Sequence, residues 1–174
     1  MENETKTLDE RIALRPVELP DDEQFLIDLY YTTRDDLQMT PLDEDQKKNV
    51  SLMQYLAQKQ HYTTHYYNWR HEIILFDDVM VGRLWTARYE TEIVGIDLSI
   101  LPEYRNLKIG TKLLTDLFEE ATGSERVFNI HVLKTNHNAL RLYERLNCKF
   151  TGETPTHFKM QWRPANQYVR STEK

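Results

Sequence analysis

The sequence predicts a layered fold of the α/β or α+β class built on one mixed sheet, and two patterns support this. Apolar residues recur every three to four positions before residue 66, as in helices, and the period changes to two from Arg70, as in strands. Farther along, residues 91–133 predict a strand, a helix and a second strand, a crossover that joins parallel strands in a right-handed sense. Helices and strands interleaved in this way pack in layers around a single sheet.

The first part of the chain predicts one strand followed by two helices. Residues 12–17 form the strand, and the proline within it restricts the strand to a sheet edge or a strand end. Asp21 and Gln24 have the spacing of a capping box at the start of the first helix, in which an acidic cap and a glutamine satisfy free N–H groups. Asp43 and Gln46 repeat that spacing at the start of the second, longer helix.

From residue 70 onward the chain predicts a β-meander and then helices that alternate with strands. Short alternating segments bounded by turn residues indicate the strands, and apolar stripes at helical spacing indicate the helices. The predicted strands are 72–76, 80–89, 91–101, 127–133, 149–151 and 157–162, and the predicted helices are 109–121 and 136–146. The complete order is β-α-α-β-β-β-α-β-α-β-β, and no repeat or linker divides it.

Length and charge limit the classes of protein to which the chain can belong. A chain of 174 residues, at roughly 100–200 residues per domain, predicts one domain over 11–163 with polar segments 1–10 and 164–174 at its ends. The net charge of −6 argues against a nucleic-acid-binding protein, although it is compatible with a local basic patch. No signal sequence and no apolar run of about 18 residues is found, so no membrane association is expected. The lone Cys148 agrees with a reducing compartment, and we expect a cytoplasmic protein.

The segment 101–111 joins a predicted strand to a predicted helix and carries the most informative chemistry. Arg105, Lys108 and Lys112 fall within eight residues that contain no acidic residue, and Gly110 allows a close approach of the backbone. The free N–H groups of a helix start add positive potential. These features are typical of a phosphate-binding loop, and they also fit an ordinary strand–helix turn with a solvated basic face.

A second motif follows the next predicted strand. It has the form Asn-x-x-Ala-x-x-Leu-Tyr-Glu-x-Leu, and its matching residues are Asn136, Ala139, Leu142, Tyr143, Glu144 and Leu146. In the loop, Arg105 and Gly110 match the two ends of an Arg/Gln-x-x-Gly-x-Gly/Ala pattern. With these two motifs and its element order, the chain resembles the GNAT family of N-acetyltransferases over about residues 11–163.

Three positions depart from the family's pattern. Lys108 stands where the loop has its middle glycine, so the backbone there must fit a curve that glycine accepts more easily. Asn147 and Cys148 replace the Gly-Phe pair that usually ends the second motif, and asparagine tolerates the left-handed conformation that a helix C-terminus needs. Cys148 itself is expected to be packed. These changes bear on the strength of cofactor binding more than on the fold.

The resemblance implies a mixed central sheet of six to seven strands with helices on both faces, and acetyl-CoA as the cosubstrate. In the family, the loop binds pyrophosphate, and backbone groups at the end of the fourth strand pair with pantetheine. The implied cofactor-binding residues are Ser99, Ile100, Leu101, Arg105, Asn106, Leu107, Lys108, Ile109, Gly110, Thr111 and Asn136. One N–H of the first three would polarise the thioester carbonyl. Asn136 also fits the position of a helix N-cap.

Acetyl transfer to an amine benefits from a base near the amine and an acid near the sulfur. The resemblance implies Tyr143 as the acid, because a phenol with a pKa of about 10 is protonated at pH 7; alternatively, Tyr143 only packs in the helix stripe. Asp97 and His131 are candidate bases, since polar residues inside apolar strands are unusual. The alternatives for them are a satisfied buried pair or a solvent-facing position. Glu92 is a third candidate base.

The expected function is an N-acetyltransferase that moves an acetyl group directly from acetyl-CoA to the primary amine of a small molecule or a peptide in a ternary complex. A non-catalytic acyl-CoA-binding protein of the same fold, or an enzyme for a longer acyl group, are the alternatives. No metal is expected, because His61 and His65 have the spacing of a metal pair without the rest of a zinc motif. The resemblance also allows a homodimer.

Acidic residues flank the link between the first two predicted helices, near the side on which the acceptor is expected. They are Asp35, Asp36, Asp43, Glu44 and Asp45. Their field would attract a cationic amine and raise its encounter rate. The alternative is that they cap helices and solvate the surface.

Overall fold

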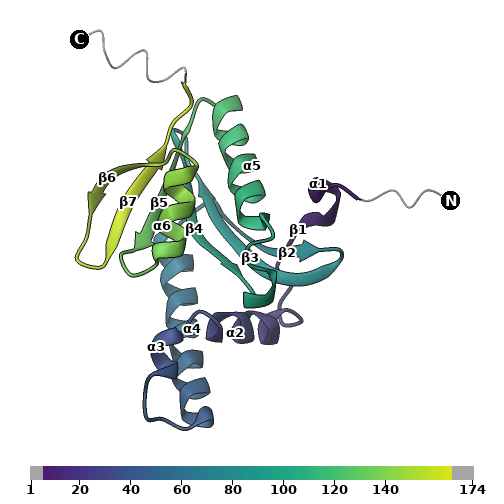
Figure 1. Cartoon of the computed structure of the whole chain (residues 1–174), viewed down its shortest axis with the longest axis vertical. Helices are drawn as coiled ribbons and strands as arrows, with labels where there is room; N and C mark the ends of the chain where they lie inside the picture. The colour runs from purple at the N-terminus through teal and green to yellow at the C-terminus, as the bar shows by residue number, and fades with distance from the viewer. Residues whose placement is uncertain (1–5, 166–174) are drawn as a thin grey trace, which may run out of the picture. The chain divides into compact units, whose positions relative to one another are not determined.

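The computed structural model describes residues 6–165, which form seven strands, six α-helices and one 3₁₀ helix (Figure 1). The strands make one mixed sheet in the order β1-β2-β3-β4-β5-β7-β6, which confirms the predicted fold class. Residues 1–5 and 166–174 of the two predicted polar segments lie outside the described residues. The elements are α1 Leu8–Arg11, β1 Ile12–Pro16, α2 Glu23–Tyr31, α3 Asp35–Gln38, α4 Glu44–His65, β2 Trp69–Phe76, β3 Val79–Arg88, β4 Glu92–Ile100, η1 Pro102–Tyr104, α5 Ile109–Gly123, β5 Val127–Leu133, α6 His137–Arg145, β6 Lys149–Glu153 and β7 His157–Trp162.

The chain divides into two compact units. One comprises Met1–Trp85 with Asp97–Ile109, and the other comprises Thr86–Ile96 with Gly110–Lys174. Strands β3 and β4 and helix α5 each contribute residues to both units. That residues 11–163 act as a single domain stays a prediction.

In the first unit, helices α2 and α4 pack together on strand β2. Strand β1 pairs antiparallel with β2, from Ile12 opposite Phe76 to Pro16 opposite Glu72. The buried residues at the centre of this unit come from α2, α4 and β2, and they are Leu26, Tyr30, Tyr55 and Ile73. Their rings and aliphatic chains fix α4 against the sheet, so the side chains along α4 are held in defined positions.

The start of α2 differs from the prediction that Asp21 caps this helix. The helix begins at Glu23, and Asp22 occupies the N-cap position without a capping hydrogen bond from its side chain. The Asp22 carboxylate instead pairs with the Arg15 guanidinium at 2.7 Å and accepts the N–H of Glu18 at 2.8 Å. The Arg15 guanidinium holds the pKa of Asp22 below its ordinary value. The prediction was wrong because an ion pair from β1 reaches this helix start.

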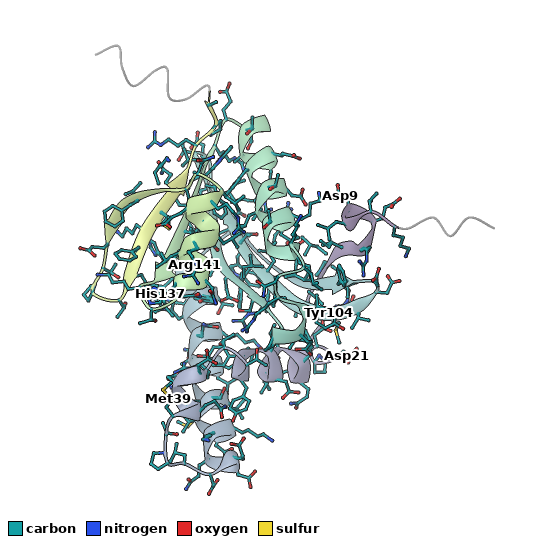
Figure 2. All side chains as sticks on the ribbon, in the orientation of Figure 1. Asp9, Asp21, Met39, Tyr104, His137 and Arg141 are labelled. Atoms are coloured by element: carbon teal, nitrogen blue, oxygen red, sulfur yellow. The ribbon has the colours of Figure 1, made fainter. Side chains whose placement is uncertain are left out.

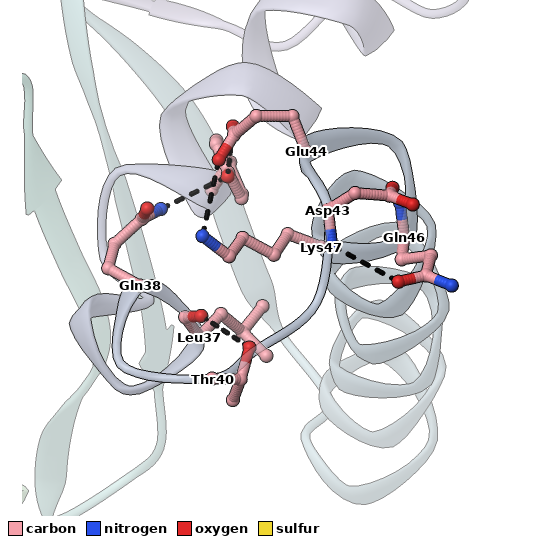
Figure 3. Close-up of polar contacts among 8 residues, drawn as sticks. Leu37, Gln38, Thr40, Asp43, Glu44, Gln46 and Lys47 are labelled. Atoms are coloured by element: carbon pink, nitrogen blue, oxygen red, sulfur yellow. Dashed lines mark hydrogen bonds and ion pairs between the residues drawn. The ribbon is translucent and has the colours of Figure 1, made fainter.

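Helix α4 begins with the predicted capping box. The Asp43 carboxylate accepts the N–H of Gln46 at 2.9 Å, and the Gln46 side chain accepts the N–H of Asp43 at 3.1 Å (Figure 3). In the same turn, the Lys47 ammonium donates to Glu44 at 3.2 Å. The Tyr31 hydroxyl donates to Glu44 at 3.1 Å, which ties the end of α2 to the start of α4.

In the second unit, β4 and β5 run parallel, as predicted for the crossover, with Glu92 opposite Val127. Strand β5 pairs antiparallel with β7, and β7 pairs antiparallel with β6 (Figure 1). Phe118 of α5 stacks on Trp162 with ring centroids 4.5 Å apart and meets Phe128 edge-on at 5.3 Å. These ring contacts hold α5 against β5 and β7.

The predicted element boundaries agree with the structure within two residues for every strand except β2. That strand begins at Trp69, three residues earlier than predicted, because α4 ends at His65 and Asn68 turns the chain with a φ of 53°. The short elements α1, α3 and η1 were not predicted, since a single helical turn carries no apolar stripe.

Candidate functional site

The loop between β4 and α5 bends through two left-handed residues. Asn106 has a φ of 63° and Lys108 a φ of 65°, so the prediction that Lys108 adopts a conformation favoured by glycine is confirmed. Tyr104 of η1, which is labelled in Figure 2, packs edge-on against Phe76 with ring centroids 6.2 Å apart. The exposed residues 105–108 therefore form a tight turn that is anchored at its first end.

Helix α5 begins directly after this turn. Ile109 is 1% exposed and holds the helix start in place, whereas Gly110 and Thr111 are half-buried. The first turn contains no acidic residue, so no negative side chain there opposes the positive potential of the free N–H groups. One turn later, the Lys112 ammonium pairs with Asp116 at 2.6 Å. A helix start of this kind can bind an anionic group.

The predicted backbone donors at the end of β4 are the N–H groups of Ser99, Ile100 and Leu101, and these groups do not all point to the same side of the strand. The N–H of Leu101 donates to the carbonyl of Val81 at 2.8 Å, so that donor is used within the sheet. Successive N–H groups of a strand point to opposite sides, so Ser99 directs its N–H as Leu101 does, and Ile100 directs its N–H away from β3. The Ile100 carbonyl accepts the Nε–H of Arg105 at 3.0 Å. Ile100 is therefore the best placed of the three to donate to a ligand.

A buried ion pair joins β3 to this end of β4. Nε of Arg83 donates to Oδ2 of Asp97 at 2.7 Å, and the Ser99 hydroxyl donates to the same oxygen at 2.9 Å. Nη2 of Arg83 donates to Oε1 of Gln58 on α4 at 2.6 Å. At Gly82, an added Cβ would lie 2.3 Å from the Ser99 carbonyl oxygen, so a glycine is needed for the two strands to approach this closely.

The two members of this ion pair differ in exposure. The Arg83 side chain is 1% exposed, and the Asp97 side chain is 19% exposed. Burial by itself lowers the pKa of Arg83, but the adjacent Asp97 carboxylate outweighs it, and the pKa is raised above its ordinary value. Oδ1 of Asp97 accepts no hydrogen bond from the residues that the structure describes. One carboxylate oxygen is thus fixed, and the other is available.

Neutral rings lie close to the ion pair. His71 of β2 stacks on Trp85 with ring centroids 3.9 Å apart. Burial lowers the pKa of His71 to about 3, with a smaller contribution from the Arg83 charge, so this imidazole is neutral at pH 7. Tyr62 of α4 meets Trp85 edge-on at 5.1 Å. Burial raises the pKa of Tyr62, and the Asp97 charge adds to that effect, so the phenol stays protonated.

The second unit holds the remaining predicted catalytic residues. Tyr143 is 4% exposed on α6, which agrees with packing in the helix stripe and leaves its role as an acid a prediction. Asn136 is the N-cap of α6, because its side-chain oxygen accepts the N–H of Ala139 at 3.0 Å. His131 is exposed on β5 opposite Lys159, and partial desolvation of its ring together with the Lys159 charge lowers its pKa.

The predicted site residues are distributed over both units. The first unit contains Asp97, Ser99, Ile100, Leu101, Arg105, Asn106, Leu107, Lys108 and Ile109. The second unit contains Gly110, Thr111, His131, Asn136 and Tyr143. Glu92, the third candidate base, accepts a hydrogen bond from the amide of Asn129. The cofactor and catalytic roles of these residues stay predictions.

Sequence reasoning did not identify Arg83 and Gln58. Arg83 interrupts an apolar strand, which is the signal that identified Asp97, so the same rule applied to β3 would have found it. Gln58 carries no such signal, because polar residues are common along α4.

Over residues 6–165, no group of three or more His, Cys, Asp and Glu side chains is arranged to hold a metal ion. No helix in that range is long and apolar enough to cross a membrane. The free Cys148 is buried as predicted, and burial raises its pKa to about 12.

The acidic residues around the link between α2 and α4 have local partners. Asp36 pairs with Arg34 at 2.6 Å, Asp43 caps α4, and Glu44 accepts hydrogen bonds at the start of that helix. The other two acids lie exposed in the first turns of α3 and α4. Local pairing supports the interpretation as caps and solvating charges, and attraction of a cationic amine stays a prediction.

Comparison with known proteins agrees with this arrangement of elements. The family model described as acetyltransferase (GNAT) family matches residues 28–148. No curated protein sequence matches the chain.

Several solved structures share the fold. The PaiA N-acetyltransferase of Thermoplasma acidophilum, in complex with coenzyme A, is 16% identical with a TM-score of 0.66, over 88% of this chain and 99% of that chain. The Campylobacter jejuni N-acetyltransferase PseH, in complex with acetyl-CoA, is 15% identical with a TM-score of 0.58, over the same shares of both chains. Arabidopsis thaliana Naa50, in complex with the bisubstrate analogue CoA-Ac-MVNAL, is 15% identical with a TM-score of 0.56, over 88% of this chain and 99% of that chain.

Proposed function

The chain belongs to the GNAT acetyltransferase family, and we propose that it transfers an acetyl group from acetyl-CoA to the primary amine of a small molecule or a peptide by direct transfer in a ternary complex. The geometry of the turn at 105–108 and of the helix start that follows it is the observation that carries this proposal. The left-handed residues Asn106 and Lys108 shape an exposed turn, and the start of α5 has no acidic residue. This combination suits a diphosphate group.

Acetyl-CoA would lie along the end of β4 and the turn. The cationic side chains of Arg105 and Lys108 are exposed beside the start of α5, where they would face the diphosphate. The N–H of Ile100 points away from β3, and we assign it to the thioester carbonyl, where a single donor contributes roughly 3–4 kcal/mol to catalysis. Asn136 would add a hydrogen bond to the pantetheine arm through the part of its amide that does not cap α6.

The chemistry requires two proton movements. The amine nitrogen forms a bond to the acetyl carbon, the carbon–sulfur bond breaks, and the electron pair leaves with the sulfur. The proton lost by the amine passes to Oδ1 of Asp97, the carboxylate oxygen without a hydrogen-bond partner among the described residues. His131 is the second candidate, because its lowered pKa keeps it neutral at pH 7. Tyr143 supplies the proton that the sulfur takes up.

The acceptor is proposed as an amine class only. Naa50 was solved with a bisubstrate analogue in which coenzyme A is joined to a peptide sequence, and this supports transfer in a ternary complex. A homodimer and a cytoplasmic location remain part of the proposal. The alternative to acetyl-CoA as the donor is a CoA thioester with a longer acyl group.

Release of free CoA tests this proposal. Purified protein is mixed with acetyl-CoA and a panel of amines that includes polyamines, lysine-containing peptides, peptides with free N-termini and amino acids, and free thiol is measured over time. The proposal predicts CoA release that depends on one class of amine. Tight binding of acetyl-CoA with no release for any amine would contradict it and favour a non-catalytic acyl-CoA-binding protein. Mass spectrometry of copurified ligand identifies the donor.

A further inference from the structure

We propose that Arg83 is a positioning residue for acetyl transfer. It holds Asp97 by one carboxylate oxygen, connects that carboxylate to helix α4 through Gln58, and leaves the second oxygen oriented towards the attacking amine. This inference rests on the proposed function and deepens it, because it names the group that orients the base.

The two carboxylate oxygens of Asp97 differ in their contacts. Oδ2 accepts from Nε of Arg83 at 2.7 Å and from the Ser99 hydroxyl at 2.9 Å. Two donors on one oxygen fix the plane of the carboxylate, and Oδ1 accepts nothing from the described part of the chain. The Asp97 side chain keeps 19% exposure, so the carboxylate retains the access that a base requires.

Burial of the Arg83 guanidinium stabilises its pairing with the Asp97 carboxylate. Arg83 is 1% exposed, and a guanidinium in that environment requires a paired charge. Because the pair has no net charge, the carboxylate does not attract an ammonium strongly. It acts instead through a directed hydrogen bond to the N–H of an amine that binds already neutral. Such preorganised orientation is the means by which a group fixed in place lowers a reaction barrier.

The guanidinium also links the base to the helical layer of its unit. Nη2 of Arg83 donates to Oε1 of Gln58 at 2.6 Å, and Nε donates to Asp97. One planar guanidinium group therefore donates to two residues in fixed directions. A lysine carries one ammonium and cannot hold both partners in that geometry. Arg83→Lys therefore keeps the charge and removes the orientation.

A double-mutant cycle with Asp97→Asn tests whether Arg83 acts through Asp97. We expect Arg83→Met and Arg83→Lys each to lower kcat about 10- to 100-fold while the Kd for acetyl-CoA stays within twofold. In the Asp97→Asn background, Arg83→Met should change kcat by less than about twofold, because its partner is already lost. An equal loss of kcat in both backgrounds would contradict the proposal. If Arg83→Met does not fold, Arg83→Lys tests the proposal instead. An unchanged kcat in Arg83→Lys would contradict the proposal.

Arg88 provides a matched control on the same strand. Its guanidinium pairs with Glu120 through two contacts of 2.7 Å in the second unit, and Arg88→Met removes that pair. We expect Arg88→Met to leave kcat within about twofold, since the ion pair that it removes includes neither Arg83 nor Asp97. A fall in kcat as large as that of Arg83→Met would overturn the proposal. Absence of activity in the unaltered protein would instead contradict the proposed function, so the two failures are distinguishable.

Discussion

Asp97→Asn should destabilise the protein strongly, because it leaves the Arg83 charge buried without a counter-ion. The substitution keeps the shape of the side chain and one oxygen for the guanidinium, while it removes the negative charge and replaces the other oxygen with an amide N–H donor. Breaking a buried ion pair in this way costs about 3–5 kcal/mol. Since the Asp97 side chain is 19% exposed, water screens part of the charge, and we expect a loss of about 3 kcal/mol in the free energy of unfolding.

Urea denaturation followed by circular dichroism measures this loss. With a slope of about 2 kcal/mol per molar urea, the unfolding midpoint should fall by about 1.5 M. The double variant Arg83→Met/Asp97→Asn removes both charges and should regain at least half of the loss, because replacing both partners of a buried pair is far milder than removing one. A loss below about 1 kcal/mol for Asp97→Asn, or a double variant no more stable than the single, would refute this account of the ion pair.

Three further predictions concern the cofactor, the acid and a buried histidine. Gly110→Glu should weaken acetyl-CoA binding at least tenfold in calorimetry, about 1.4 kcal/mol, and an unchanged Kd would place the diphosphate elsewhere. Tyr143→Phe should lower kcat roughly 10²–10⁴-fold at constant acetyl-CoA affinity, whereas equal turnover would leave Tyr143 a packing residue. Burial lowers the pKa of His71 to about 3 from 6.5, so the unfolded chain takes up the proton first as the pH falls. The free energy of unfolding therefore falls as the pH falls from 6.5 to 3. Between pH 7 and 5, the unaltered protein should lose about 2 kcal/mol more of this free energy than His71→Phe, and equal losses in the two proteins would contradict this.

The backbone conformation of single residues was predictable where a short motif sets it. Lys108 and Asn147 both adopt left-handed conformations, with φ of 65° and 63°, as their positions in the two motifs predict. Asp43 forms the predicted capping box with Gln46, three residues farther along the chain. These features depend on a few neighbouring residues, so the sequence contains all the information they need.

Features that depend on distant partners were harder to predict. Asp21 was predicted to cap α2, but Asp22 occupies the N-cap position, and its carboxylate pairs with Arg15 of β1. The contact of Arg83 with Asp97 spans fourteen residues and exists only because β3 and β4 are adjacent in the structure. A predicted meander places the two strands side by side, but it does not show which side chains meet, and for this reason Asp97 was predicted as a candidate base without its partner Arg83.

Transfer of labelled acetyl from acetyl-CoA to an amine tests the central claim most directly. The protein is incubated with acetyl-CoA labelled at the carbonyl carbon and with the amine that gives the fastest CoA release, and mass spectrometry follows the amine and the protein together. Direct transfer predicts one labelled acetyl group on the amine for each CoA released, and none on the protein. Release of CoA with labelled acetate as the product, or with the label retained on the protein, would contradict it.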